Sequence, residues 1–135
     1  MMTRQDYSYV AGFFDGEGCI GLYRQKGRNG PVLSVNLYQN HGYESDLLME
    51  QIHLKWGGTL HQARDGKGYL YRAHALQAYR FLRDIGPRLR IKKRQAEIAQ
   101  EWFEKRPGRT QGVAYPIEYM FEDTQTIQQL ADLKK

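Results

Sequence analysis

A short apolar segment that ends in two carboxylates places the strongest constraint on what this chain can fold into. Residues 9–18 read YVAGFFDGEG. Gly12 and Gly16 stand four positions apart, so in a helix they lie on one face and leave a bare strip of backbone there. Such a strip allows a second helix to approach closely. The segment therefore predicts a helix that packs through its glycines, with apolar surface supplied by Val10, Ala11, Phe13 and Phe14.

The end of this helix carries the first candidate for chemistry. Gly16 and Gly18 can adopt the left-handed conformations that terminate a helix, which places Glu17 at the carboxyl end. The helix dipole is negative at that end, so a carboxylate there is disfavoured unless a cation lies beside it. A divalent metal is one interpretation. The other is a polar turn between a helix and a strand, because glycine next to Asp or Glu is ordinary turn chemistry.

The residues on either side of this segment predict a capped helix followed by a hairpin. Thr3 and Asp6 have the spacing of a capping box, so the helix is expected to begin at 4–6 and to end near residue 15. After Cys19 the period of the apolar residues changes from helical to alternating. A turn at 25–31 separates two strands whose apolar face consists of Ile20, Leu22, Leu33, Val35 and Leu37.

The same order then repeats. A helix is expected at 43–55, ended by glycines at 57 and 58, and a second hairpin at 59–63 and 69–75. A further helix at 76–85 completes an αββαββα order, which predicts an α+β fold with a four-stranded antiparallel sheet and helices on one face. Helices at 95–105 and from 117 follow. The side chains expected to be buried in the helices at 43–55, at 95–105 and from 117 are Leu47, Leu48, Ile52, either Leu54 or Trp56, Ile98, Trp102, Met120, Phe121, Ile127 and Leu130, with Ala99 and Phe103 as further candidates.

Composition limits the classes of protein to which the chain can belong. Its 135 residues, 41% of them hydrophobic, predict a single domain over 1–135 with one core. The absence of an apolar run of about 18 residues and of a signal peptide predicts a soluble, intracellular protein without a membrane partner. One cysteine, Cys19, fits a reducing compartment. A net charge of +5 favours an anionic partner.

Residues 9–20, YVAGFFDGEGCI, resemble the signature motif of the LAGLIDADG homing endonucleases, with a position-by-position match from Val10 to Gly18. In that family the motif helix packs against its twin, and the last acidic residue of the motif binds the catalytic metal. The resemblance assigns that role to Glu17, in place of the aspartate of many members, with Gly16 beside it. Asp15 matches an earlier acidic position that braces the motif.

A second stretch extends the resemblance to most of the chain, from about residue 9 to 102. Residues 81–96, FLRDIGPRLRIKKRQA, are similar to the family's segment from which a lysine reaches the active site. Here that lysine is Lys92. Gln39 matches a position that organises water around the metal. The resemblance therefore implies a catalytic set of Glu17, Lys92 and Gln39.

A single motif per chain implies a homodimer in which two copies of Glu17 meet. The implied interface is the motif helix, through Tyr9, Gly12, Phe13 and Gly16, and the implied cofactor is Mg²⁺, with Mn²⁺ or Ca²⁺ as substitutes. Magnesium binds through one or two carboxylates together with water and phosphate oxygens, so one glutamate per subunit is sufficient. Such a dimer would bind double-stranded DNA at a palindromic or nearly palindromic site of about 20 base pairs.

The polar phase of the strands supplies the candidates for contact with DNA. Those in the first hairpin are Tyr23, Arg24, Gln25, Lys26, Arg28, Ser34, Asn36 and Tyr38. In the second hairpin the phase is open, and the candidates are His61, Arg64, Lys67 and Arg72. Five cations occur in seven residues at 88–94, and those expected at phosphates are Arg88, Arg90, Lys93 and Arg94. A solvated surface patch is the alternative interpretation of this run.

The resemblance implies a sequence-specific double-strand DNA endonuclease of the kind that acts in intron homing. A non-cleaving RNA maturase or a DNA-binding regulator on the same fold is the alternative. The presence of Glu17, Gln39 and Lys92 together favours cleavage, since a binding protein needs no carboxylate directed at a phosphate. A metal enzyme acting on a small molecule is disfavoured, because the sequence has no Cys/His cluster and no phosphate-cradling loop.

Overall fold

The computed structural model describes residues 2–24, 30–106 and 115–134. No helix among these residues is both long and apolar enough to cross a membrane. The order of the elements up to α3 is the predicted αββαββα. The elements are α1 (Arg4–Glu17), β1 (Gly18–Arg24), β2 (Pro31–Asn40), α2 (Tyr43–Trp56), β3 (Thr59–Gln62), β4 (Gly68–His74), α3 (Ala75–Ile85), a 3₁₀ turn (Gly86–Arg88), α4 (Lys93–Glu104) and α5 (Ile117–Leu133).

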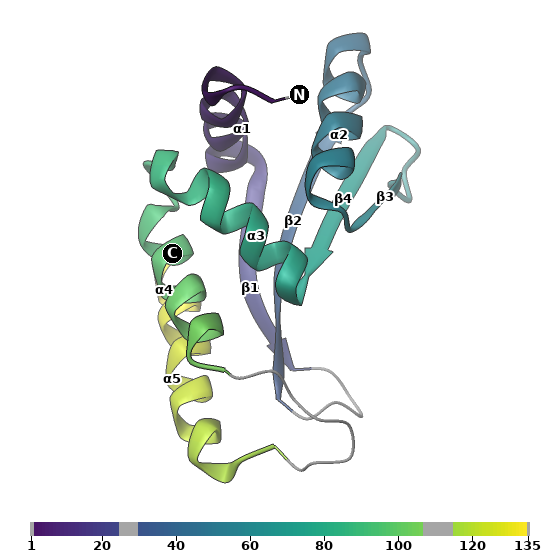
Figure 1. The fold of residues 1–135 in the computed structure, drawn as a ribbon. Coiled ribbons are helices and arrows are strands. Elements are labelled where there is room, and N and C mark those ends of the chain that lie inside the picture. Colours follow the sequence, from purple (N-terminus) through teal and green to yellow (C-terminus); the bar gives the residue numbers. More distant parts are fainter. Residues whose placement is uncertain (1, 25–29, 107–114, 135) are drawn as a thin grey trace.

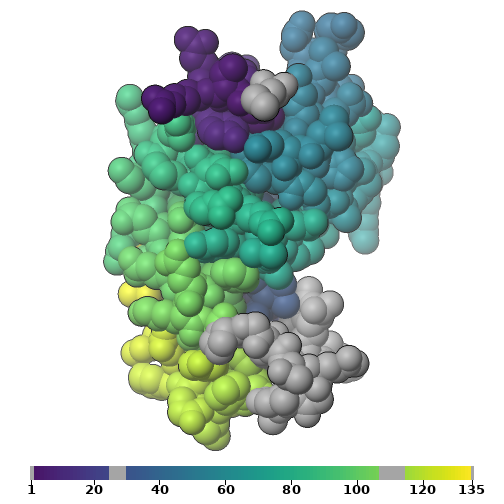
Figure 2. All heavy atoms as spheres, viewed as in Figure 1, coloured from purple at the N-terminus to yellow at the C-terminus, as the bar shows by residue number. Residues whose placement is uncertain are grey.

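The strands form one antiparallel sheet in the order β1-β2-β4-β3. The two hairpins are joined because β4 pairs with β2, and the helices cover one face of the sheet (Figure 1). Seen from the helix side, the side chains of α1, α2, α3 and α4 cover most of the strands (Figure 2). The predicted α+β fold, with a four-stranded antiparallel sheet and helices on one face, is therefore confirmed.

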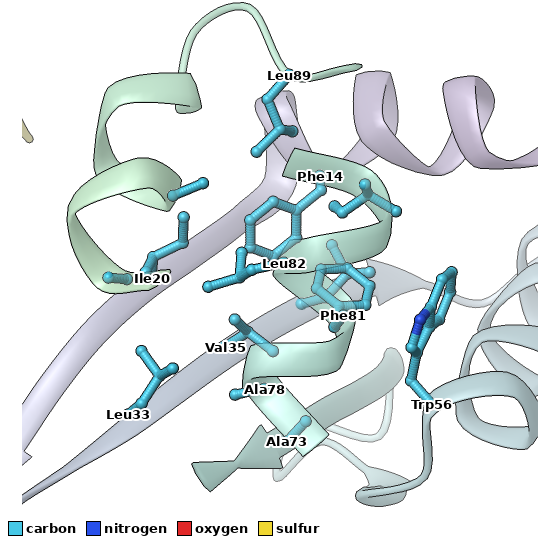
Figure 3. Close-up of a cluster of buried hydrophobic side chains, with 14 of the residues drawn as sticks. Phe14, Ile20, Leu33, Val35, Trp56, Ala73, Ala78, Phe81, Leu82 and Leu89 are labelled. Carbon is cyan, nitrogen blue, oxygen red and sulfur yellow. The ribbon is translucent and has the colours of Figure 1, made fainter. Parts of the chain in front are cut away.

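The core lies between the sheet and the helices, and it takes the inward-facing residues of β1, β2 and β4. Leu33, Val35 and Leu37 of β2 are buried as the alternation predicts. Against them pack aromatic rings from three helices: Phe14 meets Phe81 edge-on with ring centroids 5.1 Å apart, and Trp56 meets Phe81 at 4.9 Å (Figure 3). Full burial of such a side chain contributes about 1.5–3 kcal/mol, so this cluster fixes α1, α2 and α3 on the sheet.

In the second hairpin the structure shows which side chains of β4 face the helices and which face outward. Tyr71 and Ala73 of β4 are fully buried on the helix side. Side chains alternate along a strand, so Leu70, Arg72 and His74 lie on the opposite, outer face. The pairing of β4 with β2 places that face in one plane with the outer face of the first hairpin.

Helix α1 begins as predicted and ends later than predicted. Thr3 and Asp6 form both hydrogen bonds of a capping box. The helix continues through Glu17, and neither Gly16 nor Gly18 adopts the expected left-handed conformation; Gly18 has φ −94° and ψ 170°. A Cβ at Gly18 would instead lie 2.2 Å from the Phe14 ring. Glycine is required there for space, because the chain turns directly from helix into strand beneath a buried ring.

Two predicted helical faces are correct only in part: Ile52 and Trp56 of α2 and Leu130 of α5 are buried as predicted, and other members are not. In α2 the buried residues are Met49, Ile52 and Trp56, whereas Leu47 and Leu54 are exposed. Leucines occur on more than one side of this helix, and Trp56, which packs on Phe81, determines which side faces inward. Apolar spacing did not distinguish between these sides.

In α5 the expected core residues Met120 and Phe121 are exposed, and the inward face is formed by Asp123, Thr126 and Leu130. The cause is a buried polar contact. The Asp123 carboxylate accepts hydrogen bonds from Trp102 Nε1 at 2.7 Å and from the Arg106 guanidinium at 2.5 Å. A buried carboxylate must be paired, so this contact sets the rotation of α5.

Candidate functional site

Glu17 is the last residue of α1 and its side chain is exposed. Within the described part of the chain its carboxylate makes no hydrogen bond and no ion pair. It lies at the rim of a groove of about 590 Å³ between α1 and α2. Gln39 enters the same groove from the end of β2, because Gly18 pairs with Leu37 and the helix end is thereby held beside the strand end. The groove is lined by Tyr9, Phe13, Glu17, Gln39, Glu44, Ser45, Leu47, Leu48 and Gln51.

Asp15 fixes a second segment at the end of α1. It is buried, and its two carboxylate oxygens accept hydrogen bonds from the backbone N–H groups of Arg90 at 2.8 Å and Lys92 at 2.9 Å. Hydrogen bonds to a charged acceptor are stronger than those between neutral groups. Asp15 thus holds residues 90–92 against the helix that carries Glu17.

Lys92 is held at the same place through its side chain. Its ammonium Nζ donates to the backbone carbonyl oxygen of Asp15 at 2.5 Å. That carbonyl belongs to the last turn of α1, where the helix dipole is negative and a cation is favoured. The structure therefore brings Lys92 to the helix end that carries Glu17, while Gln39 lies with Glu17 in the groove.

The donors at this helix end are few, which excludes an all-protein metal site among the described residues but suits a magnesium ion. Among the described residues there is no group of three or more Asp, Glu, His or Cys side chains that could hold a metal. One unpaired carboxylate, Glu17, is present, and Gly16 is exposed beside it. Magnesium is commonly bound by one or two carboxylates with the remaining positions filled by water or phosphate, so an exposed carboxylate such as that of Glu17 fits its demands.

The outer face of the sheet forms a second candidate surface. The register places on this face the following predicted contact residues: Tyr23, Ser34, Asn36, Tyr38, His61 and Arg72. Ser34 is buried, whereas His61 and Arg72 are exposed. The predicted residues Gln25, Lys26 and Arg28 lie outside the residues that the structure describes.

Two of the outer-face tyrosines have partners within the chain. The Tyr23 ring lies over Gly21, where a Cβ would be 2.4 Å from it, and burial raises the pKa of its hydroxyl. The Tyr38 hydroxyl donates to Asn40 Oδ1 at 2.9 Å. Neither hydroxyl projects from the sheet without a neighbour.

The remaining predicted cations differ in how they are held. Arg24 donates to Thr124 Oγ1 of α5 at 2.9 Å, which draws it away from the outer face. The Arg88 guanidinium lies 5.6 Å from the centre of the Tyr7 ring and donates to the Asp84 carbonyl oxygen. The exposed ones among them are Arg64 and Lys67, in the turn between β3 and β4, and Arg90, Lys93 and Arg94, around the start of α4.

In the second hairpin, three outer-face side chains are absent from the sequence-based candidates. Thr59, Leu70 and His74 share the face of Arg72. The sequence does not show which side of β4 is buried, because Tyr69, Tyr71 and Ala73 are residue types that occur on either side of a strand. The signal that could have found these residues is the position of Arg72, because an arginine on an otherwise apolar strand favours the solvent side.

Comparisons with known proteins are informative at the level of structure. No protein-family model and no curated protein sequence matches the chain. The fold is similar to that of the homing endonuclease I-CvuI, solved with a DNA target in the presence of Mg, with a TM-score of 0.75, 19% identity, and coverage of 96% of this chain and 82% of that one. It is also similar to the archaeal intron-encoded homing endonuclease I-Vdi141I complexed with DNA, with a TM-score of 0.70, 17% identity, and coverage of 97% and 85%.

A longer structural neighbour is the LAGLIDADG meganuclease I-AabMI bound to uncleaved DNA. Here the TM-score is 0.55 and the identity 19%, and the match covers 95% of this chain but 43% of that one. At these identities the likeness concerns the fold. The helix that ends in Glu17, the sheet it leads into and the overall arrangement all agree with the resemblance carried by residues 9–20, and the chain has the fold of the LAGLIDADG homing endonucleases.

Proposed function

We propose that the chain is a sequence-specific double-strand DNA endonuclease, a homing endonuclease that hydrolyses phosphodiesters with a divalent metal. The observation that carries the proposal is the exposed Glu17 carboxylate, which has no partner among the described residues although it stands at the unfavourable end of a helix dipole. A bound cation would relieve this placement, which costs an exposed carboxylate about 0.3–1 kcal/mol. Solved structures with this fold include complexes with DNA, one of them in the presence of Mg and another in the presence of Ca.

The active unit in this proposal is a homodimer through α1. A Cβ added at Gly12 or at Gly16 would meet nothing within 4 Å, so neither glycine is explained by packing within the chain. Each costs about 1 kcal/mol of helix stability relative to alanine. A second helix packed on this strip supplies the reason. The exposed side chain of Tyr9, 69% accessible and three residues before Gly12 on α1, would be covered in the same contact.

The structural neighbours support a unit built from two such folds. The chain matches 43% of I-AabMI, a length that leaves room for a second unit of this size in one polypeptide. In a symmetric pair of this chain, Glu17 of each copy would approach the same axis, one for each DNA strand. The target would then be palindromic or nearly so.

In the proposed reaction each group has one task. Glu17, with the Gly16 backbone beside it, would hold Mg²⁺, which when bound polarises the scissile phosphate and neutralises developing charge. Gln39, in the groove beside Glu17, would orient the attacking water. Lys92, already at the end of α1, would place its ammonium near the charge that develops on the phosphate oxygens.

Selection of a cut site tests the activity. A randomised palindromic duplex library of about 20 base pairs is incubated with the protein and Mg²⁺, and Glu17→Gln is the paired variant. We expect one enriched cut sequence with the natural chain and at least a hundredfold slower cleavage with the variant, since metal stabilisation is worth several kcal/mol. Because Glu17 is exposed, the melting temperature should not change. Retention of DNA or RNA without cleavage would instead favour the regulator or the maturase.

The dimer is tested by Gly12→Ala. Alanine should raise the thermal stability of the monomer slightly, because helix propensity improves by about 1 kcal/mol and the added methyl meets nothing. The same methyl should prevent close helix packing, so sedimentation equilibrium should show a dimer for the natural chain and a monomer for the variant. Glu97→Ala, on the exposed side of α4, is the control. An unchanged mass for Gly12→Ala would contradict the proposed interface.

A further inference from the structure

Two cations from separate elements lie beside one aromatic ring on the helix side of the sheet. The ring is that of Tyr7 in α1, and it is partly buried. Lys55 Nζ, near the end of α2, lies 5.9 Å from the ring centre, and the Arg88 guanidinium of the 3₁₀ turn lies 5.6 Å from it. The two charges are therefore at most about 12 Å apart, close to the distance over which salt screens charges in water.

Neither cation is neutralised within the described chain. Lys55 forms no ion pair or hydrogen bond there, and Arg88 donates one hydrogen bond, to the backbone carbonyl oxygen of Asp84 at 3.3 Å. The Asp84 carboxylate accepts from Trp56 Nε1 at 2.8 Å and lies 3.6 Å from Arg83 Nε. Since Arg83 offsets that carboxylate, the group around the ring keeps a net positive charge.

The convergence of the two cations is not explained by the contacts that hold each of them. A single exposed cation beside an aromatic ring is common. The carboxyl ends of α2 and α3 also attract cations, which accounts for Lys55 and Arg88 separately. Two cations at the same ring repel each other, however, and neither helix end gives a reason for their meeting at Tyr7. An anion bound between them supplies that reason.

The core beneath the ring fixes the geometry of this group. Tyr7 packs on Trp56, with ring centres 5.8 Å apart, and Trp56 is buried against Phe81 (Figure 3). The Trp56 indole is bound to Asp84, and the carbonyl oxygen of the same residue holds Arg88. The ring and the guanidinium are thus held in place before a ligand arrives, which lowers the entropic cost of binding.

The unused donors match the chemistry of phosphate. The remaining N–H groups of Arg88, the Lys55 ammonium and the Tyr7 hydroxyl have no acceptor within the described chain. Arginine binds two phosphate oxygens with parallel N–H groups, and lysine binds phosphate as a point charge. A phosphate group presents oxygens in several directions and carries up to two negative charges, so it pairs with cations that approach from two elements.

We propose that Tyr7, Lys55 and Arg88 form a binding site for a phosphate group, either a free anion or a phosphate of a single-stranded nucleic acid. The site is independent of the proposed nuclease. It lies among the helices that cover one face of the sheet, and Tyr7 precedes Glu17 by about ten residues, or about 15 Å along α1 (Figure 1).

The indole N–H signals of the two tryptophans test the site by nuclear magnetic resonance. Trp56 lies against Tyr7, whereas Trp102 is bound to Asp123 between α4 and α5 and is an internal control. The full-length chain is titrated with inorganic phosphate, and separately with hexauridylate that carries no terminal phosphate, at constant ionic strength. We expect a saturable shift of the Trp56 signal alone, with a Kd for inorganic phosphate of about 1 mM. The probe that binds more tightly identifies the source of the phosphate.

Substitutions at the site give the second measurement. Arg88→Gln and Lys55→Gln each remove one charge and keep a polar side chain, so each should weaken binding about tenfold. Tyr7→Phe keeps the ring and removes the hydroxyl, and its effect should be smaller. Arg80→Gln, at an exposed cation of α3, is the matched control and should bind as the natural chain does.

The outcomes separate this site from the proposed nuclease. Absence of a Trp56 shift with either probe up to about 20 mM would overturn the inference. Equal binding by the natural chain and Arg88→Gln would also overturn it, and so would parallel shifts of both indole signals, which report only a general response to anions. Glu17→Gln should bind phosphate as the natural chain does, so a failure of the nuclease proposal leaves this result unchanged.

Discussion

The chain contains two helix-to-hairpin units, and they differ most where the helix meets the first strand. In the first unit α1 passes into β1 without an intervening residue. In the second, α2 is separated from β3 by Gly57 and Gly58, both with positive φ, 78° and 90°. The first junction is braced by hydrogen bonds from residues 90–92 to Asp15, whereas Gly57 forms only the ordinary end-of-helix bond to His53.

The first junction is held by hydrogen bonds from a distant segment, whereas the second is a local glycine turn. At the end of α2 the turn is local: Gly57 and Gly58 have positive φ, and the His53 ring contacts the Gly58 carbonyl oxygen at 3.1 Å. At the end of α1 the buried Asp15 and the segment it binds hold the backbone, so that the neighbouring Glu17 can remain exposed and unpaired within the described chain. Asp15 stabilises the junction, and Glu17, two residues later, keeps an exposed carboxylate.

The largest effect should come from removing the brace. In Asp15→Ala, two backbone N–H groups lose a charged acceptor in a buried place, and each such loss costs about 1–3 kcal/mol. We expect a loss of about 3 kcal/mol in the free energy of unfolding and a fall of about 10 °C in melting temperature. Glu50→Ala, an exposed carboxylate of α2, is the control in calorimetry. A change of less than 1 kcal/mol would show that the two junctions are held alike.

The second effect concerns the glycines at the two junctions, which are needed for different reasons. Gly18→Ala would force a Cβ into the buried Phe14 ring and should cost about 2 kcal/mol. Gly57→Ala should cost about 1–3 kcal/mol, because φ 78° and ψ −155° are nearly confined to glycine.

Double variants distinguish these two causes. Replacing Phe14 by Leu should recover part of the Gly18→Ala loss, since the clash is with the ring. Replacing Gln77, the side chain nearest a Cβ at Gly57, by Ala should recover little of the Gly57→Ala loss, since there the cost lies in the backbone. Denaturant titration measures the free energy of unfolding of the two single glycine variants and of the two double variants. Equal recovery in both pairs would remove the distinction between the junctions.

Much of the first unit could be predicted from the sequence because its signals are local. The Thr3–Asp6 capping box, the alternation at Leu33, Val35 and Leu37, and the resemblance of residues 9–20 each depend on residues close together in the chain. The features that could not be predicted depend on contacts between distant segments. They include the exposure of Leu47 and Met120, the rotation of α5 by Asp123, and the hydrogen bonds from residues 90–92 to Asp15.

The smallest effect should appear at the entry to the second unit, where an exposed histidine joins β2 to α2. His41 contacts Gln62 Oε1 through Nε2 at 3.0 Å and Asp46 Oδ1 through Nδ1 at 2.9 Å. The hydrogen bond with Gln62, followed by that with Asp46, raises the pKa of His41 above its ordinary value of 6.5. A histidine with two acceptors uses both ring N–H groups only when it is protonated.

The sign of the pH dependence follows from the raised pKa. A group that binds its proton more tightly in the folded state adds stability below the pKa of the unfolded chain, and that stability is lost as the pH rises through the folded pKa. The melting temperature of the natural chain should therefore exceed that of His41→Ala most at pH 5.5, and the gap should narrow towards pH 8. A gap that is constant or widens with pH would mean that neutral His41 makes the same contacts. The entry to the second unit would then be insensitive to the protonation of this histidine.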